Sequence, residues 1–367
     1  MKWRVSLAVA TFGSFLVLSV AAPEMSMREA AQASRMLVGT AIRPWALTEE
    51  AYSATLAREF NMVEPEDALK WEAVHPQPET YDFSQGDQVV DFARRHGMKV
   101  RGHTLVWHRQ NPKWLNEGKF TSRELTEILE KHIKAVVGHY RGQIFAWDVV
   151  NEAFDEVHPG QLRSTIWRDQ PGITPREDVG ASREAIGERG YSYIEQCFRW
   201  AHEADPQALL FYNEAEAEVV NPKSDAIYGM VRDFRKRGVP IDGVGFQMHV
   251  TNLYADVASI AANIKRFTAL GVQVHITELD VALPVDAAGD ATAEELRRQG
   301  EIYGQITRAC LSDAGCTAIQ TWGFTDKYSW IGSHSKHTQG AALLFDRNYL
   351  PKASYQTMKK EMEAGRR

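Results

Sequence analysis

Cysteine is scarce in this chain, which has three cysteines among 367 residues. None of them stands beside histidines at the spacing of a zinc site, so the sequence predicts no bound metal. Cys310 and Cys316 are near enough to close a short loop, and export of the protein would favour a disulfide between them. Cys197 falls within a helical pattern and is predicted to be a buried, unpaired thiol.

An excess of positive charge is also missing. The chain carries 42 Lys and Arg against 48 Asp and Glu, a formal net charge of −6. Nucleic-acid partners call for a basic patch, which this composition does not supply, so we expect none. No G-x-G-x-x-G or P-loop pattern follows an expected strand, and this absence counts against a nucleotide-binding sheet.

A long apolar run occurs once, at the N-terminus. Lys2 and Arg4 precede an apolar stretch at residues 5–20, and Ser19-Val20-Ala21 fits a cleavage site. The first 22 residues therefore predict a signal peptide, with an uncleaved N-terminal anchor as the alternative. In either case we expect residues 23–367 to lie outside the cytoplasm. A signal peptide favours a secreted or periplasmic protein without a stable membrane partner over a membrane-anchored one.

Short apolar runs alternate eight times with longer amphipathic stretches in the rest of the chain. The runs are apolar or β-branched, which is typical of parallel strands buried on both faces. The expected strands are Leu37–Ile42, Met62–Pro65, Lys99–Leu105, Ile144–Val149, Leu209–Tyr212, Val244–Met248, Val272–Ile276 and Thr317–Gln320. Helical patterns between them include Thr48–Phe60, Thr121–Tyr140, Ser224–Arg237, Asp256–Leu270 and Glu294–Asp313. Eight such units without a linker predict one (β/α)8 barrel over residues 23–367.

The ends of these helical patterns carry stop and start signals. Thr121 is followed three residues later by Glu124, which predicts a capping box, whereas Thr48 is a weak cap. Gly238 and Gly271 follow their helices as expected C-terminal stops. The segment 155–190, rich in proline, glycine and charge, breaks the alternation and is predicted to be a functional or poorly ordered loop.

Polar and aromatic residues gather where the expected strands end. In a barrel of this type all strand C-termini open onto one face, which carries the active site. The segments concerned are E-D-A-L-K-W (66–71), G-H-T-L-V-W-H (102–108), W-D-V-V-N-E (147–152), Y-N-E (212–214), G-F-Q-M-H (245–249), I-T-E-L-D (276–280) and T-W-G-F-T-D (321–326). Their convergence at one barrel mouth predicts a site there.

Glu152 and Glu278 are the predicted catalytic pair, at the ends of the fourth and seventh strands. Glycoside hydrolysis needs one protonated carboxyl and one ionised carboxylate, so the environment has to push the two pKa values apart. A lone Glu at a strand end is usually a solvated loop residue, but each of these has polar neighbours. Asn151 is predicted to bind a sugar hydroxyl, and His249 and Asp280 to form a chain that orients Glu278.

Aromatic residues are plentiful, with 10 Trp and 12 Tyr. Trp107, Trp322 and Trp330 are either core residues or the walls against which sugar rings stack, and their place beside the carboxylates favours the second reading. His103 and His249 raise the alternative of a metal site. They lie on separate strands and no H-E-x-x-H helix is present, so no metal is predicted.

These motifs resemble family 10 of the glycoside hydrolases, the endo-β-1,4-xylanases. W-D-V-V-N-E-A (147–153) is similar to that family's acid/base motif and I-T-E-L-D (276–280) to its nucleophile motif. The segments 102–108, 245–249, 321–326 and G-A-A-L-L-F-D (340–346) match as well, in the order and spacing of the family. The resemblance extends from about Leu37 to the final helix.

The resemblance implies a retaining, two-step hydrolysis of xylan, with Glu278 as nucleophile and Glu152 as acid and base. Retention calls for carboxyl groups about 5–5.5 Å apart. By the same resemblance no cofactor is required, the partner is the polysaccharide or its oligosaccharides, and a monomer is expected. The implied substrate-binding residues are Glu66, Lys70, His103, Trp107, Asn151, Gln247, His249, Trp322 and Trp330.

The chain departs from the family pattern in three places. Asp67 stands where the family usually has Asn, and an ionised Asp only accepts hydrogen bonds. Glu214-Ala215-Glu216 stands where the family commonly has Asp-Tyr-Asn, so an aromatic ring and an amide are lost. The segment 155–190 is longer than the family's usual connection. We therefore expect a xylanase with altered subsites on the leaving-group side.

Two alternatives remain open at this point. A related retaining barrel hydrolase would act on β-glucan or mannan, because the pair of Glu residues alone is shared by several such enzymes. A carbohydrate-binding barrel without activity would keep the aromatic groove and lose a carboxylate. Glu66, Lys70, His103 and Trp330 favour xylan over the first alternative, and the presence of both catalytic Glu residues argues against the second.

Overall fold

The computed structural model describes residues 25–169 and 191–365. The predicted signal peptide or anchor, residues 1–22, lies outside the described residues, as does the later part of the 155–190 segment. Within the two described ranges, no helix combines the length and the apolar character needed to cross a lipid bilayer.

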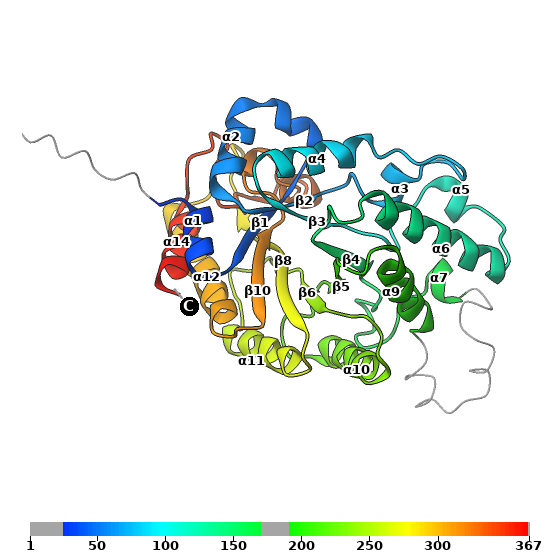
Figure 1. Cartoon of the computed structure of the whole chain (residues 1–367). Helices are drawn as coiled ribbons and strands as arrows, with labels where there is room; N and C mark the ends of the chain where they lie inside the picture. The colour runs from blue at the N-terminus through cyan, green and yellow to red at the C-terminus, as the bar shows by residue number, and fades with distance from the viewer. Residues whose placement is uncertain (1–24, 170–190, 366–367) are drawn as a thin grey trace, which may run out of the picture.

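Eight parallel strands close into a barrel, which confirms the predicted (β/α)8 fold (Figure 1). Neighbouring strands pair in sequence order, and the ring closes because the last strand pairs with both the first and the seventh. The strands are β1 (Leu37–Ile42), β2 (Met62–Pro65), β3 (Lys99–Gly102), β4 (Ala146–Asn151), β5 (Leu209–Glu214), β6 (Gly243–Phe246), β8 (Gln273–Val281) and β10 (Cys316–Thr321). A short strand, β7 (His249–Val250), pairs with the end of β8.

Helices surround the strands on all sides in Figure 1. The longer ones are α1 (Met27–Ala33), α2 (Glu50–Glu59), α4 (Ser84–Arg95), α6 (Ser122–His139), α9 (Ser192–Ala204), α10 (Pro222–Arg237), α11 (Val257–Thr268), α12 (Ala293–Leu311) and α14 (Ala353–Ala364). The short elements are α3 (Trp71–Val74), α5 (Lys113–Asn116), α7 (Ile166–Asp169), α13 (Ile331–His334), η1 (Pro44–Thr48), η3 (Asp326–Tyr328), β9 (Leu283–Pro284) and β11 (Gln339–Gly340). The C-terminal α14 packs against α12 and α1, so the two ends of the described chain lie side by side.

Local signals set several helix ends as predicted. Thr121 and Glu124 form the capping box of α6, with the Thr121 amide donating to Glu124 at 2.7 Å. Gly238 and Gly271 follow α10 and α11 with φ of 68° and 76°, the left-handed region that glycine adopts without a steric penalty. The expected helix start at Thr48 is wrong, because that residue ends η1 and α2 begins at Glu50 without a side-chain cap.

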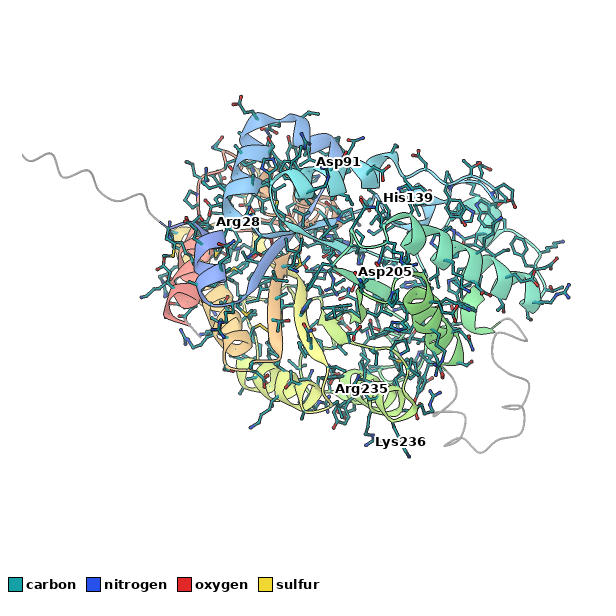
Figure 2. All side chains as sticks on the ribbon, viewed as in Figure 1. Arg28, Asp91, His139, Asp205, Arg235 and Lys236 are labelled. Carbon is teal, nitrogen blue, oxygen red and sulfur yellow. A yellow bond between two sulfur atoms is a disulfide. The ribbon has the colours of Figure 1, made fainter. Side chains whose placement is uncertain are left out.

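Figure 2 shows charged side chains on the outside of the helical layer. Arg235 and Lys236 lie in the last turn of α10 and are exposed, and basic groups there complement the negative end of the helix dipole. The inner faces of the helices bury apolar residues against the strands instead, such as Ile227, Val231 and Phe234 of α10, none of which is exposed. The helices are thus charged on the outside and packed against the strands on the inside, and the candidate site lies at the ends of the strands.

The cysteine predictions are confirmed. Cys310, near the end of α12, and Cys316, at the start of β10, form a disulfide with an S–S distance of 2.00 Å. Cys197 is a free cysteine of the described residues and lies buried in α9. Burial raises the pKa of its thiol, so Cys197 behaves as a small apolar core residue.

Candidate active site

A cleft of about 630 Å³ opens at the C-terminal ends of the strands. It contains both predicted catalytic carboxyls and every predicted substrate-binding residue. Its walls are formed by Glu66, Lys70, His103, Trp107, Arg109, Gln110, Asn151, Glu152, Glu156, Ala215, Glu216, Gln247, His249, Thr251, Glu278, Trp322, Trp330 and His334. The structure thus brings together the residues that the sequence analysis singled out, with Asp280 behind them.

Glu152 follows directly after β4 and has a backbone φ of 53°, in the left-handed region that residues with a side chain rarely adopt. Its amide donates to the carbonyl of Asn213 at 3.0 Å. Two neutral donors meet the carboxylate: Gln247 Nε2 reaches Oε1 at 2.9 Å, and Trp107 Nε1 reaches Oε2 at 2.8 Å. Both carboxylate oxygens therefore have a hydrogen-bond partner within the protein.

The surroundings of Glu152 act on its pKa in opposite directions. Burial raises the pKa of this carboxyl, but the hydrogen bonds from Gln247 and Trp107 and the nearby His108 and Arg109 outweigh it and leave the pKa below its ordinary value. These contacts therefore favour the ionised form of Glu152, because two N–H groups point at its carboxylate. Protonation has to come with a change in these surroundings.

Glu278 lies within β8 and is 4% exposed. Asn213 Nδ2 donates to its Oε1 at 2.8 Å, and His249 Nε2 lies 3.2 Å from its Oε2. The other ring nitrogen of His249 is 3.0 Å from Asp280 Oδ2, which also accepts from Trp330 Nε1 at 2.9 Å. This is the predicted chain of His249 and Asp280 around Glu278.

His249 stands between two carboxylates. Burial lowers the pKa of the imidazole, but Asp280 and Glu278 outweigh burial and hold the pKa well above its ordinary value. The imidazolium has an N–H on both ring nitrogens, so it forms an ion pair with Asp280 on one side and donates a hydrogen bond to Glu278 on the other. The charge-assisted hydrogen bond fixes the direction of the Glu278 carboxylate.

A chain of amide groups links the two carboxyls. Gln247 Nε2, which contacts Glu152, also lies 3.2 Å from Asn151 Oδ1, and Asn213 Nδ2, which contacts Glu278, lies 3.0 Å from the same oxygen. Because Gln247 and Asn213 present their NH2 groups to carboxylates, the Asn151 atom that faces both of them is its oxygen. Asn151 therefore couples the positions of the two catalytic side chains.

Asn213 is a functional residue that the sequence analysis did not assign, although it stands in the Y-N-E segment at the end of β5. Its side-chain oxygen Oδ1 accepts from Thr277 Oγ1 at 2.7 Å, which fixes the direction of its NH2 group. Gly245 on β6 makes room for it, since a Cβ there would lie 2.1 Å from Asn213 Oδ1. A glycine opposite an asparagine across two neighbouring strand ends was the available signal.

The side of the cleft near β2 carries a braced set of charges. Arg43 donates to both oxygens of Glu66 at 2.7 Å, and Lys70 Nζ lies 3.0 Å from Asp67 Oδ1. Lys70 also stands over the Trp107 ring at 4.9 Å from its centroid. Asp67, the first departure from the family pattern, thus holds Lys70 in place, and Arg43 is a further residue that the sequence analysis did not assign.

The ionisation of Asp67 follows from the same contacts. Burial raises its pKa, but Lys70 and the hydrogen bond from Gln110 Nε2, at 3.0 Å, outweigh burial and lower the pKa. The ionised carboxylate accepts from Lys70 and Gln110, and both donors line the cleft. The departure at this position is therefore compensated by local donors.

His103 stands above a buried charged cluster inside the barrel. Its Nδ1 lies 3.0 Å from Asp148 Oδ2 and 3.4 Å from Glu64 Oε1, and the ligand atoms of these three residues lie within 4.8 Å of one another. Arg101, which is fully buried, already pairs with Asp148 through two hydrogen bonds. A divalent cation would have to share this space with the guanidinium, so the cluster does not favour a metal. The absence of a metal stays a prediction.

The side of the cleft that is predicted to take the leaving group is lined by Ala215, Glu216 and Glu156, the last from the start of the 155–190 segment. Arg163 in that segment donates to the carbonyl of Glu152 at 3.2 Å and pairs with Glu156 at 3.1 Å. Glu216 is exposed, with φ of 56°. The described part of the segment therefore folds back onto the end of β4, while no aromatic ring stands at position 215.

Comparison with known proteins gives consistent matches over nearly the whole chain. The profile of glycosyl hydrolase family 10 matches residues 26–361. Endo-1,4-beta-xylanase B of Thermotoga neapolitana is 41% identical over 320 residues, covering 87% of this chain and 86% of that protein. Beta-1,4-xylanase of Dictyoglomus thermophilum is 39% identical over 312 residues, covering 83% and 82%.

Solved structures give the same result. Xylanase 10B from Thermotoga petrophila in complex with xylobiose superposes with a TM-score of 0.85 at 39% identity, over 94% of this chain and 99% of that one. Native xylanase 10B from Thermotoga maritima superposes with a TM-score of 0.84 at 40% identity, over 92% and 98%. These identities are high enough to carry more than the fold.

Proposed function

The chain belongs to glycosyl hydrolase family 10 and is an endo-1,4-β-xylanase, and we propose that it works by double displacement with Glu278 as nucleophile and Glu152 as acid and base. The observation that carries the proposal is the linked pair of carboxyls in one cleft. Glu278 and Glu152 line the same cavity and are joined through Asn213, Asn151 and Gln247.

In the first step, Glu278 attacks the anomeric carbon and forms an ester with the sugar on the glycone side. The bond to the leaving sugar breaks, and Glu152 transfers its proton to the departing oxygen. His249 supports this step, because its hydrogen bond aims the Glu278 carboxylate. In the second step, Glu152 removes a proton from water, the water oxygen attacks the anomeric carbon, and Glu278 leaves with the configuration retained.

Substrate binding is what loads the proton onto Glu152. The hydrogen bonds from Gln247 and Trp107 favour the ionised form of Glu152. A bound sugar chain excludes water, which raises the pKa of a carboxyl, and it draws Gln247 and Trp107 toward its own hydroxyl groups. Glu152 thus becomes an acid in the complex, where the proton is needed.

We expect the two sides of the cleft to bind the xylan chain with different strength. Glu66 and Lys70 are held by Arg43 and Asp67, so they are preorganised to receive hydroxyl groups on the glycone side. On the other side, Ala215 offers no ring for stacking and Glu216 offers only acceptor oxygens. We expect weaker binding of the leaving sugars than in relatives with an aromatic residue there, and the lengths of the products from xylohexaose would measure it.

A substrate panel tests the proposed function. Reducing sugar is measured after incubation of the enzyme with xylan, carboxymethylcellulose and mannan under the same conditions. Release from xylan well above the other two polymers is expected, because curated relatives at 39–41% identity are named as xylanases. If more reducing sugar is released from carboxymethylcellulose or mannan than from xylan, the substrate is β-glucan or mannan. If none of the three polymers is cleaved, the protein is a carbohydrate-binding barrel without activity.

Export and a monomeric state complete the proposal. The disulfide between Cys310 and Cys316 supports an oxidising compartment outside the cytoplasm. Mass spectrometry of the mature secreted protein would show removal of residues 1–22 or their retention as an anchor. Light scattering during gel filtration would show whether the protein is a monomer.

A further inference from the structure

The chain immediately after Glu152 is held by two side chains that do not line the cleft. The amide of Ala153 donates to the hydroxyl of Tyr212 at 3.0 Å, and the amide of Phe154 donates to Glu214 Oε2 at 3.1 Å. Glu152 itself has φ in the left-handed region, a conformation that persists where surrounding contacts impose it. These two contacts fix the peptide groups next to the strained residue.

Tyr212 and Glu214 form one buried unit. They are two residues apart on β5, so their side chains leave the strand on the same face, opposite to Asn213. Tyr212 donates to Glu214 Oε2 at 2.5 Å, while Lys223 Nζ lies 3.0 Å from Glu214 Oε1. The three side chains are at most 2% exposed, and Lys223 comes from α10. A unit tied to both the sheet and a helix is a rigid support.

We propose that Tyr212 and Glu214 are positioning residues for Glu152, which hold its backbone in the left-handed conformation that turns the carboxyl into the cleft. The inference rests on the proposed role of Glu152 as acid and base. Neither residue touches the space that substrate occupies, since neither lines the cleft. They act through the amides of Ala153 and Phe154. Glu214 is also one of the positions at which the chain departs from the family pattern.

A general acid is sensitive to such support because proton transfer requires the donor within hydrogen-bond reach of the leaving oxygen. A misplacement of about 1 Å can cost roughly 100-fold in rate. The loss should depend on the leaving group, because a leaving group that departs as a stable anion needs no proton. Damage to folding alone, in contrast, would lower activity on every substrate by the same factor.

The test uses Tyr212→Phe and Glu214→Asp in the full-length enzyme. Tyr212→Phe removes one oxygen and keeps the ring, and Glu214→Asp keeps the carboxylate but draws it back by one methylene. Values of kcat/KM are measured with xylotetraose and with 2,4-dinitrophenyl β-xylobioside, whose leaving group needs no proton. We expect a loss of at least about tenfold on xylotetraose and less than about twofold on the dinitrophenyl substrate.

The chain offers a matched control in Tyr355 and Glu59. Tyr355 donates to Glu59 Oε2 at 2.7 Å, and the same oxygen accepts the amide of Met27 at 2.9 Å. This buried pair repeats the contacts of Tyr212 and Glu214 but joins α14, α2 and α1, away from the cleft. Tyr355→Phe and Glu59→Asp should lower the midpoint of thermal unfolding and leave the ratio of the two kcat/KM values unchanged.

The outcomes separate this inference from the proposed function. A ratio that changes in Tyr212→Phe or Glu214→Asp, but not in the control pair, supports positioning. Equal losses on both substrates in both variants overturn it, provided that Glu152→Ala still shows the leaving-group dependence. If Glu152→Ala lowers kcat/KM by the same factor on both substrates, the assignment of Glu152 as the acid fails, and with it the premise of the inference.

Discussion

Glu278 and Glu152 face the same cleft, but the protein holds them in different ways. Glu278 lies within a strand and receives hydrogen bonds from Asn213 and from the cationic His249. Glu152 comes after its strand has ended, in a left-handed conformation, and it contacts the neutral donors Gln247 and Trp107. The nucleophilic carboxylate has to be ionised and aimed at the anomeric carbon when it attacks, whereas the carboxyl that serves as acid and base has to gain and lose a proton in each catalytic cycle. The firm support of Glu278 and the exchangeable contacts of Glu152 fit these two roles.

The largest expected effect is that of Glu278→Ala. Removal of the nucleophile should lower kcat on xylan by about 10⁴-fold or more, since no other group can form the ester. Xylo-oligosaccharides should still bind, because Glu66, Lys70 and the tryptophans remain, and calorimetry would measure that binding. Residual kcat above about a tenth of the wild-type value would contradict the assignment.

The second effect is that of Glu152→Ala, and it should depend on the substrate. Loss of the general acid should lower kcat/KM on xylan by roughly 10²–10⁴-fold. The value for 2,4-dinitrophenyl β-xylobioside should fall by less than about tenfold, and added azide should raise its turnover by taking the place of the activated water. The same loss on both substrates would show that Glu152 is not the acid.

A smaller effect follows from the hydrogen bond between Trp107 and Glu152. Trp107→Phe removes a donor that stabilises the carboxylate, so the pKa of Glu152 should rise and the basic limb of kcat/KM should move to higher pH, by up to about one unit. Trp330→Phe is the matched control, since its indole donates to Asp280 in the same cleft. A basic limb that stays in place in Trp107→Phe would contradict the proposed control of this pKa.

The smallest effect concerns stability. Burial raises the pKa of Glu214 to about 7 from 4.5, against the opposing influence of Lys223 and Tyr212. Between these two pH values the folded protein keeps a proton that the unfolded chain releases, so the free energy of unfolding falls as the pH rises. Relative to Glu214→Gln, the free energy of unfolding should fall by roughly 1 kcal/mol per pH unit, and the fall should end above pH 7. Urea unfolding at pH 5, 6 and 7 would measure it, and parallel curves would contradict it.

Much of the fold could be predicted from the sequence because it depends on local periodicity. Strands β1 and β2 have the predicted bounds, since each is a short apolar run between clear breaks. Strand β8 runs on to Val281, five residues past the predicted end at Ile276, because its polar end is buried by contacts that no local pattern encodes. Helix α2 starts later than predicted for a related reason: η1 takes up Thr48, and Glu49 then precedes the helix without a side-chain cap.

The sequence predicts which residues line the site but not which of their atoms contact one another. The C-terminal ends of the strands open onto one face of the barrel, so the sequence predicts that residues such as Glu152, Glu278 and Gln247 line the same cleft. Which atoms pair is a matter of tertiary geometry. For the place of Asn213 in the chain of amides, the sequence offered only the glycine at position 245 on the neighbouring strand. The contact of Arg43 with Glu66 leaves no mark in the spacing of the sequence. The lowered pKa of Glu152 has the same origin, because it depends on two donors from other strand ends.

The most direct measurement is to trap the glycosyl-enzyme. Incubation with 2-deoxy-2-fluoro-xylobiosyl fluoride, which loses fluoride in the first step and stalls before the second, should add one 2-deoxy-2-fluoro-xylobiosyl group, two sugar rings, to the protein. Mass spectrometry of the peptides should then place the ester on Glu278. An ester on Glu152 or on another residue, or release of product with inverted configuration, would contradict the account.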